Sequence, residues 1–180
     1  IVACLVGSEM CIRDSNTGFM GGATPDDTGH SILLSLRRMN RIREIDPVNM
    51  SMTVEAGCVL QSLHEATEQQ GLYFTLNLAA KGSCTIGGNL GTNAGGLNVV
   101  RYGTTRELTL GVEVVLIGGR VLNLLSGLRK DNTGYDLRHL FVGSEGTLGV
   151  ITAATMKLFP QPVSRATAFA EVRDVEAAVE

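Results

Sequence analysis

The chain has 180 residues, of which 44% are hydrophobic and 18% are charged, so it can bury a core as one domain or as two small subdomains. Its net charge of −3 argues against a nucleic-acid or anionic-membrane surface, which needs a basic excess. No apolar run reaches the roughly 18 residues that a membrane-spanning helix requires. Four cysteines without a C-x-x-C pair and three widely spaced histidines indicate neither a zinc ribbon nor a disulfide framework, so we expect reduced thiols.

Residues 1–15, IVACLVGSEMCIRDS, show neither strand alternation nor a capped helix. They resemble the translated adaptor sequence found at the ends of environmental assemblies, and we expect this segment to be non-native or disordered. An ordinary N-terminal strand and turn is the alternative.

Three strands are predicted next. Short or alternating apolar runs predict them at residues 31–36, 41–46 and 51–56, with a turn at 38–40 and turn chemistry at 46–49. One basic cluster falls here, which we interpret as a solvated turn with its flanking strands; it consists of Arg37, Arg38, Arg41 and Arg43.

A helix is predicted over residues 59–70. Four of its residues share one face: Leu60, Leu63, His64 and Thr67. Gly71 occupies the position of a C′ glycine, which ends a helix in the left-handed conformation.

The second half of the chain is rich in glycine. Glycine accounts for 22 of the 180 residues, about 12% against a usual share of roughly 7%, and residues 82–96 are predicted to be a glycine loop. A strand at 108–117, a Gly118-Gly119 turn and a return strand at 120–125 form a predicted hairpin.

The remaining segment predicts a polar stretch at 128–137, a short helix over 136–142 and a glycine turn that leads into a strand within 143–159. Asp174 is a candidate N-cap for a further helix. Hairpins and short connections favour a mixed or antiparallel α+β fold over a doubly wound parallel sheet.

The glycines do not match three common site motifs. No two glycines are separated by one residue, so the dinucleotide-binding G-x-G-x-x-G pattern is absent. No lysine follows a glycine, which excludes a P-loop. The glycine spacing of a nucleophile elbow is missing around Ser83, Ser126 and Ser144.

The 82–96 segment carries hydroxyl and amide side chains among its glycines. Missing side chains let a ligand approach the backbone, and successive N–H groups can form an anion-binding concavity. That chemistry suits a phosphate or pyrophosphate held without lysine. Asn16-Thr17-Gly18 with Gly21-Gly22 has the same character on a smaller scale, although tight turns alone would account for it.

Four motifs in order carry a resemblance: NTGFMGGATP (16–25), KGSCTIGGNLGTNAGG (81–96), LRKDNTGYDL (128–137) and GSEGTLGVIT (143–152). Together they resemble the PCMH-type FAD-binding domain of the vanillyl-alcohol oxidase superfamily. Within it, the sequence is most similar to the GlcD-like FAD-linked dehydrogenases, and RKDNTGYDL points toward the D-2-hydroxyglutarate and D-lactate dehydrogenase branch.

The resemblance covers about residues 16–180 and implies an α+β fold of two subdomains with FAD between them. It implies a first subdomain at 16–80, a second at 81–165 and the start of a cap or substrate domain at 166–180. The FAD-binding residues it implies are Asn16, Thr17 and Gly18 in the first pyrophosphate loop, Gly82, Ser83, Thr85, Gly87 and Gly88 at the pyrophosphate and ribityl chain, Thr92, Asn93 and Gly95 near the flavin, and Gly149 and Val150 at the adenosine end.

The first loop departs from the family pattern. Arg13-Asp14-Ser15 stands where the family has a Gly-Gly pair, and Asp14 would repel phosphate. Members that attach FAD covalently have a histidine where Asn16-Thr17 stand, so we expect non-covalent FAD.

The resemblance implies oxidation of a D-2-hydroxy acid, of the 2-hydroxyglutarate, lactate or glycolate type, by hydride transfer to FAD, with an electron acceptor that the sequence does not identify. The family's catalytic base and any metal ligands lie in a cap domain downstream of residue 180, so no catalytic or metal-binding residue is assigned here and the chain alone is expected to be inactive. A cytoplasmic location is expected, or the mitochondrial matrix in a eukaryote.

Several alternatives stay open. The same fold serves flavin oxidases and reductases, and the chain as given could be an inert FAD-binding fragment. The side chains of Lys130, Asn132, Thr133 and Tyr135 either line the flavin side of the pocket or only build their loop. His139 is interpreted as a surface or core histidine, and Cys84 as a small packing residue.

Overall fold

A computed structural model describes residues 10–13, 17, 18, 24, 27, 32–164 and 166–179. The predicted site residue Asn16 and the glycines Gly21 and Gly22 lie outside these residues. The strands are β1 (Met10–Arg13), β2 (Ile32–Ser35), β3 (Ile42–Asp46), β4 (Ser51–Glu55), β5 (Leu72–Tyr73), β6 (Thr109–Val115), β7 (Val121–Leu124), β8 (Val150–Lys157) and β9 (Phe159–Pro160). The helices are α1 (Leu60–Glu68), α2 (Ile86–Gly91), α3 (Val99–Tyr102), α4 (Thr105–Leu108), α5 (Arg138–Phe141) and α6 (Val175–Val179).

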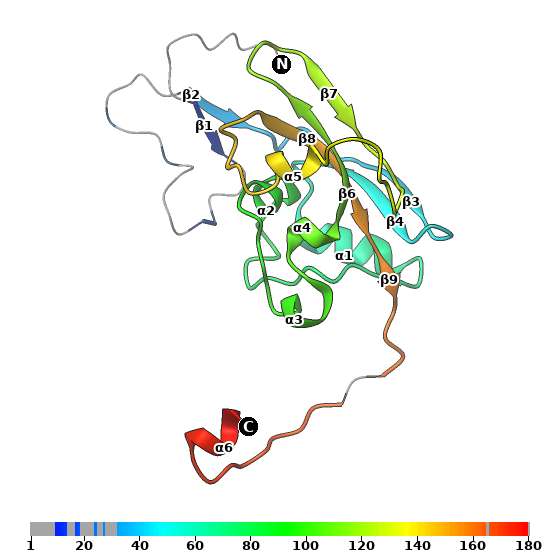
Figure 1. The fold of residues 1–180 in the computed structure, drawn as a ribbon, viewed down its shortest axis with the longest axis vertical. Coiled ribbons are helices and arrows are strands. Elements are labelled where there is room, and N and C mark those ends of the chain that lie inside the picture. The colour runs from blue at the N-terminus through cyan, green and yellow to red at the C-terminus, as the bar shows by residue number, and fades with distance from the viewer. Residues whose placement is uncertain are drawn as a thin grey trace.

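The centre of the structure is a five-stranded sheet of order β3-β4-β8-β6-β7 (Figure 1). Every neighbouring pair in it is antiparallel. Strands β1 and β2 form a separate parallel pair, and β5 pairs with β9. The predicted mixed or antiparallel α+β arrangement is therefore confirmed.

The turn before β4 shows why its sequence forms a turn. One carboxylate oxygen of Asp46 accepts hydrogen bonds from the backbone N–H groups of Val48 (2.9 Å) and Asn49 (3.0 Å). This Asx-type arrangement satisfies donors that the strands leave unpaired. The reversal places β4 beside β3, with Asp46 opposite Ser51.

The two strands predicted at 31–36 and 41–46 both form, but they do not pair with each other. Strand β2 pairs in parallel with β1, Met10 opposite Ile32, whereas β3 pairs with β4. Residues 1–15 show no strand pattern, yet Met10–Arg13 form a strand. The pairing with β2, about twenty residues further along the chain, stabilises this strand, and local alternation does not indicate it.

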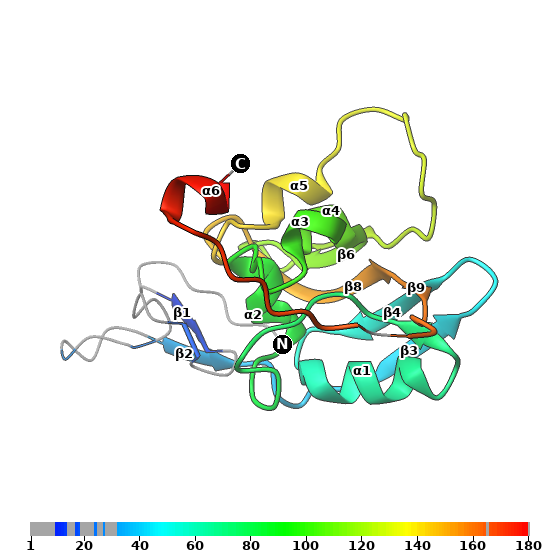
Figure 2. The same cartoon turned by 90° about the horizontal axis from the view of Figure 1, so that it is seen from below.

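One hydrophobic core covers an inner face of the main sheet. It combines Leu60 and Leu63 of α1 with Val54, Val112 and Met156 of three neighbouring strands, all nearly inaccessible to solvent. In Figure 2, α1 lies on one side of β3 and β4. The predicted helical face is confirmed. The helix ends at Glu68 with Gln69 as its C-cap, so Gly71, which adopts the predicted left-handed conformation with φ +68°, lies one residue beyond the C′ position predicted for it.

Residues 82–96 are not the continuous loop that their glycine content predicted. Residues 86–91 form α2, whose buried residues Ile86, Asn89 and Leu90 recur at helical spacing. Burial of this apolar edge against the core outweighs the poor helix propensity of three glycines, as tertiary packing commonly does.

The main sheet joins strands from both sides of residue 80. Strand β4 pairs with β8 over five residues, from Ser51 opposite Lys157 to Glu55 opposite Ala153. Strands from both sides of residue 80 are therefore neighbours in one sheet.

Beyond β9 the chain runs in an extended form away from the sheet and ends in the short helix α6 (Figure 1). The Asp174 carboxylate accepts a hydrogen bond from the Ala177 N–H at 2.9 Å, which confirms the predicted cap. Among the described residues, no helix is long and apolar enough to cross a membrane.

Candidate functional site

The structure brings the second and fourth motifs together at the C-terminal end of α2. The N–H of Gly143 donates to the carbonyl of Leu90 (2.9 Å), and the N–H of Glu145 donates to the carbonyl of Gly91 (3.0 Å). Two segments some fifty residues apart in sequence thus share one backbone surface. We call residues 82–96 and 143–150 together the glycine surface.

The N-terminal end of α2 is hydrogen-bonded to the segment that follows β4. The N–H of Ile86 donates to the carbonyl of Cys58, and the N–H of Gly87 donates to that of Ala56 at 2.7 Å. A Cβ at Gly87 would lie 2.8 Å from the Cβ of Ala56, so only glycine permits this approach. Packing accordingly accounts for the glycine at this position.

Of residues 149 and 150, Val150 packs against the same residue, Ala56. Val150 packs against Leu36 and Ala56 in a small cluster beside the main core, and the Ala56 N–H donates to the carbonyl of Thr152 (2.9 Å). A Cβ at Gly149 would come within 2.8 Å of Val114. Ala56 therefore links the predicted residues of the second and fourth motifs.

Thr85 precedes α2 in an extended conformation and is 3% exposed. Its hydroxyl is buried and has no hydrogen-bond partner among the described residues. An unpaired buried hydroxyl is unfavourable by about 1–3 kcal/mol, so this position is suited to a group that the protein alone does not supply.

The other predicted residues of the 82–96 segment are more accessible. Gly82, Ser83 and Thr92 are exposed, while Gly88 and Gly95 are partly buried. The two hydroxyls donate to local carbonyls, that of Ser83 to Ala80 (3.2 Å) and that of Thr92 to Gly88 (2.9 Å).

Asn93 adopts φ +50°, which is uncommon for a residue with a side chain. Its side-chain oxygen accepts a hydrogen bond from the backbone N–H of Arg106 at 2.9 Å. The Arg106 guanidinium reaches the carbonyls of His139 and Val142, each at 2.5 Å. Sequence reasoning missed Arg106, because its role comes from tertiary contacts and it belongs to none of the motifs.

In the first glycine motif, Gly18 is exposed and a Cβ there would meet no described atom within 4 Å. Thr17 is partly buried, and both residues are among the few described in this region.

Residues 128–137 form an exposed loop that extends from the body in Figure 2. Tyr135 is 92% exposed. A shallow cleft of about 220 Å³ lies at its base, between Leu110, Leu124 and Arg138. Exposure of Lys130, Asn132 and Thr133 is compatible with either of their two interpretations.

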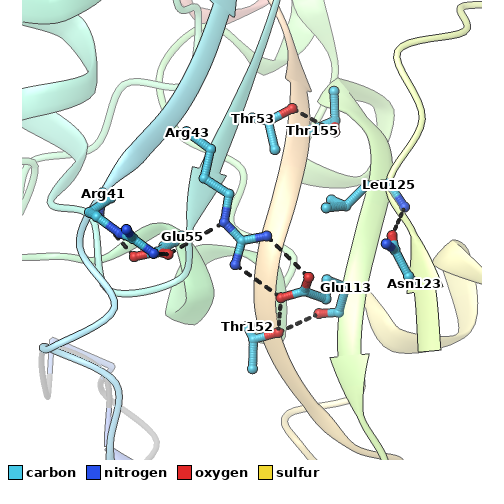
Figure 3. Close-up of polar contacts among 9 residues, drawn as sticks. All are labelled: Arg41, Arg43, Thr53, Glu55, Glu113, Asn123, Leu125, Thr152 and Thr155. Carbon is cyan, nitrogen blue, oxygen red and sulfur yellow. Dashed lines mark hydrogen bonds and ion pairs between the residues drawn. The ribbon is translucent and has the colours of Figure 1, made fainter. Parts of the chain in front are cut away.

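An ion-pair network crosses four neighbouring strands of the main sheet, β3, β4, β8 and β6 (Figure 3). Arg43 of β3 binds both carboxylate oxygens of Glu113 at 3.1 Å and also contacts Glu55 at 3.4 Å. Thr152 donates to Glu113 at 2.8 Å. Arg41 adds a guanidinium bond to the buried Glu55 at 3.0 Å. The basic cluster is therefore only partly a solvated turn, since two of its arginines are paired.

The network shifts the carboxyl groups toward their charged forms. Hydrogen bonds from Arg43 lower the pKa of Glu113. Burial raises the pKa of Glu55, but bonds from Arg41 outweigh burial, and the net shift is downward. Both glutamates are thus ionised at neutral pH.

Two buried thiols and His139 are further titratable groups near the core and the loop. Cys58 and Cys84 both lie buried, and burial raises the pKa of the Cys58 thiol to about 11, which favours packing roles. His139 lies on α5, 3.5 Å from the Asp136 carboxylate. Within the part of the chain that the structure describes, no three His, Cys, Asp or Glu side chains are grouped so as to hold a metal ion.

Comparison with known sequences gives matches over most of the chain. Residues 4–125 match the family described as FAD binding domain. The chain is 53% identical over 157 residues to the mitochondrial D-2-hydroxyglutarate dehydrogenase of Bos taurus, covering 87% of this chain and 28% of that protein. It is 46% identical over 146 residues to the D-2-hydroxyglutarate dehydrogenase of Xanthomonas citri, covering 81% and 30%.

A further relative is the glycolate oxidase subunit GlcD of Bacillus subtilis, 40% identical over 168 residues, covering 93% of this chain and 35% of that protein. Among solved structures, an alkyldihydroxyacetonephosphate synthase matches with a TM-score of 0.77 and 25% identity, covering 87% of this chain and 28% of the other. The chain thus spans about a third or less of the length of the proteins it matches.

Proposed function

Because the chain belongs to the FAD binding domain family, we propose that it forms the flavin-binding portion of an oxidoreductase that oxidises a D-2-hydroxy acid. The observation that supports this most is the joining of segments 82–96 and 143–150 into one glycine surface through main-chain hydrogen bonds. The substrate class rests on the relatives named D-2-hydroxyglutarate dehydrogenase and glycolate oxidase.

The described residues fit FAD. The buried hydroxyl of Thr85 has no partner among the described residues, so a bound group would complete its hydrogen bonding. No acidic side chain stands in the first turn of α2, where it would repel a pyrophosphate. The glycines at 82, 88 and 95 leave the backbone accessible, as an extended dinucleotide requires.

We propose that Gly82, Ser83, Thr85, Gly87 and Gly88 hold the pyrophosphate and ribityl chain. Thr92, Asn93 and Gly95 would lie beside the flavin, with Gly149 and Val150 at the adenosine end and Asn16, Thr17 and Gly18 on the opposite subdomain. Ser83 and Thr92 would have to turn their hydroxyls away from the carbonyls they now bind to donate to a ligand.

When bound, FAD supplies a hydride acceptor at N5. The chain's own part is to orient the ring and exclude water. We propose that FAD is held without a covalent bond, that the base which takes the substrate proton lies outside residues 1–180, and that any metal ion binds there too. A mitochondrial or bacterial setting is suggested by the names and organisms of the relatives.

An oxidase that passes electrons to oxygen is the second candidate, favoured by the similarity to a glycolate oxidase subunit. Oxygen consumption during turnover with a 2-hydroxy acid separates it from a dehydrogenase. A reductase of the same fold has no relative among those described above.

The test of flavin binding uses the natural protein that carries this chain, at its full length. We expect it to purify with a yellow chromophore that acid or heat releases intact. A colourless protein that also fails to take up added FAD would refute the proposed function. A chromophore that stays attached after denaturation would refute non-covalent binding alone.

A further inference from the structure

The first residues of helix α4 form hydrogen bonds with Asn93 and Ala94 of the second motif, and we call this set of contacts the clamp. The Glu107 carboxylate accepts hydrogen bonds from the N–H (2.6 Å) and the hydroxyl of Thr104, which defines the start of the helix. Thr105 then donates twice to the Ala94 carbonyl, from its N–H at 3.0 Å and its hydroxyl at 2.7 Å. Arg106 continues the clamp by donating its N–H to the side chain of Asn93.

The side chain of Arg106 reaches from this clamp to the backbone just before the fourth motif. Its two terminal nitrogens donate to the carbonyls of His139 and Val142, at the end of α5. Gly143 lies so close that a Cβ there would be 2.9 Å from the guanidinium. Arg106 therefore ties the side chain of Asn93, by its main chain, to the carbonyls of His139 and Val142, by its side chain.

The connection is closed on its other side by the main chain. Gly143 and Glu145 donate to Leu90 and Gly91, as described above. The result is a ring of contacts that runs from α2 to Asn93, through Arg106 to Val142, and back to α2. Within this ring, the Arg106 guanidinium supplies the side-chain donors that reach the backbone just before the fourth motif.

We propose that Arg106 is a positioning residue for FAD: it sets the relative placement of the two halves of the glycine surface and thereby shapes the flavin site without binding the cofactor itself. This inference rests on the proposed function. Its guanidinium donors are directed at two carbonyls, so Arg106 acts through geometry and not as a charge on the pyrophosphate.

Lysine cannot take over this role. The guanidinium is a planar fork whose terminal nitrogens reach two acceptors at once, whereas a lysine ammonium is a single point on a flexible stem. An alanine leaves both carbonyls without the donor and opens space under Gly143. Lysine should keep the charge and one contact, so its effect should be intermediate.

The experiment measures FAD affinity and the visible circular dichroism of bound flavin in the full-length protein carrying this chain. We expect Arg106→Ala to weaken FAD binding on the order of tenfold and Arg106→Lys about threefold, with an altered flavin dichroism in both. The matched control is Arg120→Ala, which removes an exposed arginine just before β7, outside the glycine surface and outside all four motifs. It should leave affinity and dichroism unchanged.

The outcomes separate the two proposals. A wild-type protein that does not bind FAD refutes the proposed function, and this inference with it. A wild-type protein that binds FAD, with Arg106 variants that match it in affinity and dichroism, refutes only the role of Arg106. If the alanine variant does not fold, the lysine variant decides by the same two readouts.

The salt dependence of FAD affinity distinguishes a positioning effect from a direct charge effect. A positioning effect predicts the same ratio of affinities between wild type and Arg106→Ala at low and high salt. A ratio that collapses at high salt would show that Arg106 acts as a charge on the ligand and would overturn the proposal.

Discussion

The ion-pair network across β3, β4, β6 and β8 allows a prediction of stability and of its pH dependence. In Glu113→Gln the side chain keeps its shape and can still accept the hydrogen bond from Thr152, but it loses the charge that two nitrogens of Arg43 bind at 3.1 Å. The Glu113 side chain is 17% exposed and that of Arg43 is 30% exposed, so the pair lies between a surface bridge and a buried one.

We expect Glu113→Gln to lower the free energy of unfolding by about 2 kcal/mol at pH 7, since breaking buried pairs costs about 3–5 kcal/mol and exposed pairs contribute about 0–1 kcal/mol. For a chain of this size that corresponds to a drop in Tm of about 4–8 °C. Arg43 keeps its contact with Glu55, which limits the loss.

The sign of the pH dependence follows from the lowered pKa of Glu113 in the folded protein. The carboxylate contributes stability that is fully present above its unfolded pKa, about 4.3, and is lost as pH falls through the lower folded pKa. The difference between wild type and Glu113→Gln should therefore shrink in acid. Urea unfolding followed by far-ultraviolet circular dichroism at neutral and acidic pH measures it.

The matched control is Glu44→Gln, an exposed glutamate on the same strand as Arg43 but outside the network. It should change the free energy of unfolding by no more than a few tenths of a kcal/mol. Wild-type stability in Glu113→Gln at neutral pH would refute the reasoning. So would a destabilisation that is unchanged in acid.

Three further predictions concern the glycine surface and its surroundings. Gly87→Ala should lower the free energy of unfolding by about 1–3 kcal/mol, because its Cβ would press on Ala56; thermal unfolding of the apoprotein checks it, and an unchanged Tm contradicts the packing argument. Thr85→Val should leave the apoprotein as stable or slightly more stable, since it removes an unpaired buried hydroxyl, yet weaken FAD binding in a titration; unchanged FAD affinity would remove Thr85 from the site. The Cys58 thiol, buried and with its pKa raised to about 11, should react with a thiol reagent at pH 8 only after denaturation, and rapid labelling of the folded protein would show that it is accessible.

The family could be predicted from the sequence because its signal is local. Each of the four motifs is a short run in which glycine, hydroxyl and amide residues have fixed spacing, and the match to the FAD binding domain family over residues 4–125 confirms the resemblance. The helix over 60–68, the left-handed Gly71 that follows it and the β6–β7 hairpin were predictable for the same reason, since periodicity, caps and turn residues act over a few positions.

Other features were not predictable because their causes lie far away along the chain. Helix α2 forms inside a glycine-rich segment because Ile86 and Leu90 find a core built by distant strands. Strand β1 forms in a segment that shows no alternating pattern. Arg41 and Arg43 form ion pairs with glutamates on β4 and β6.

Residue types and their spacing indicate the chemistry of this chain: backbone donors, hydroxyls and amides suited to an extended anionic cofactor, with no catalytic base assigned within it. The arrangement of those groups becomes visible only in the folded chain. Gly87 lies so close to Ala56 that a side chain would not fit there. The second and fourth motifs share main-chain hydrogen bonds, and Arg106 bonds to Asn93 and to the carbonyl of His139. The physical reason is that residue type and spacing specify local conformation and donor chemistry, whereas close approach and shared hydrogen bonds depend on partners that only the folded chain brings within reach.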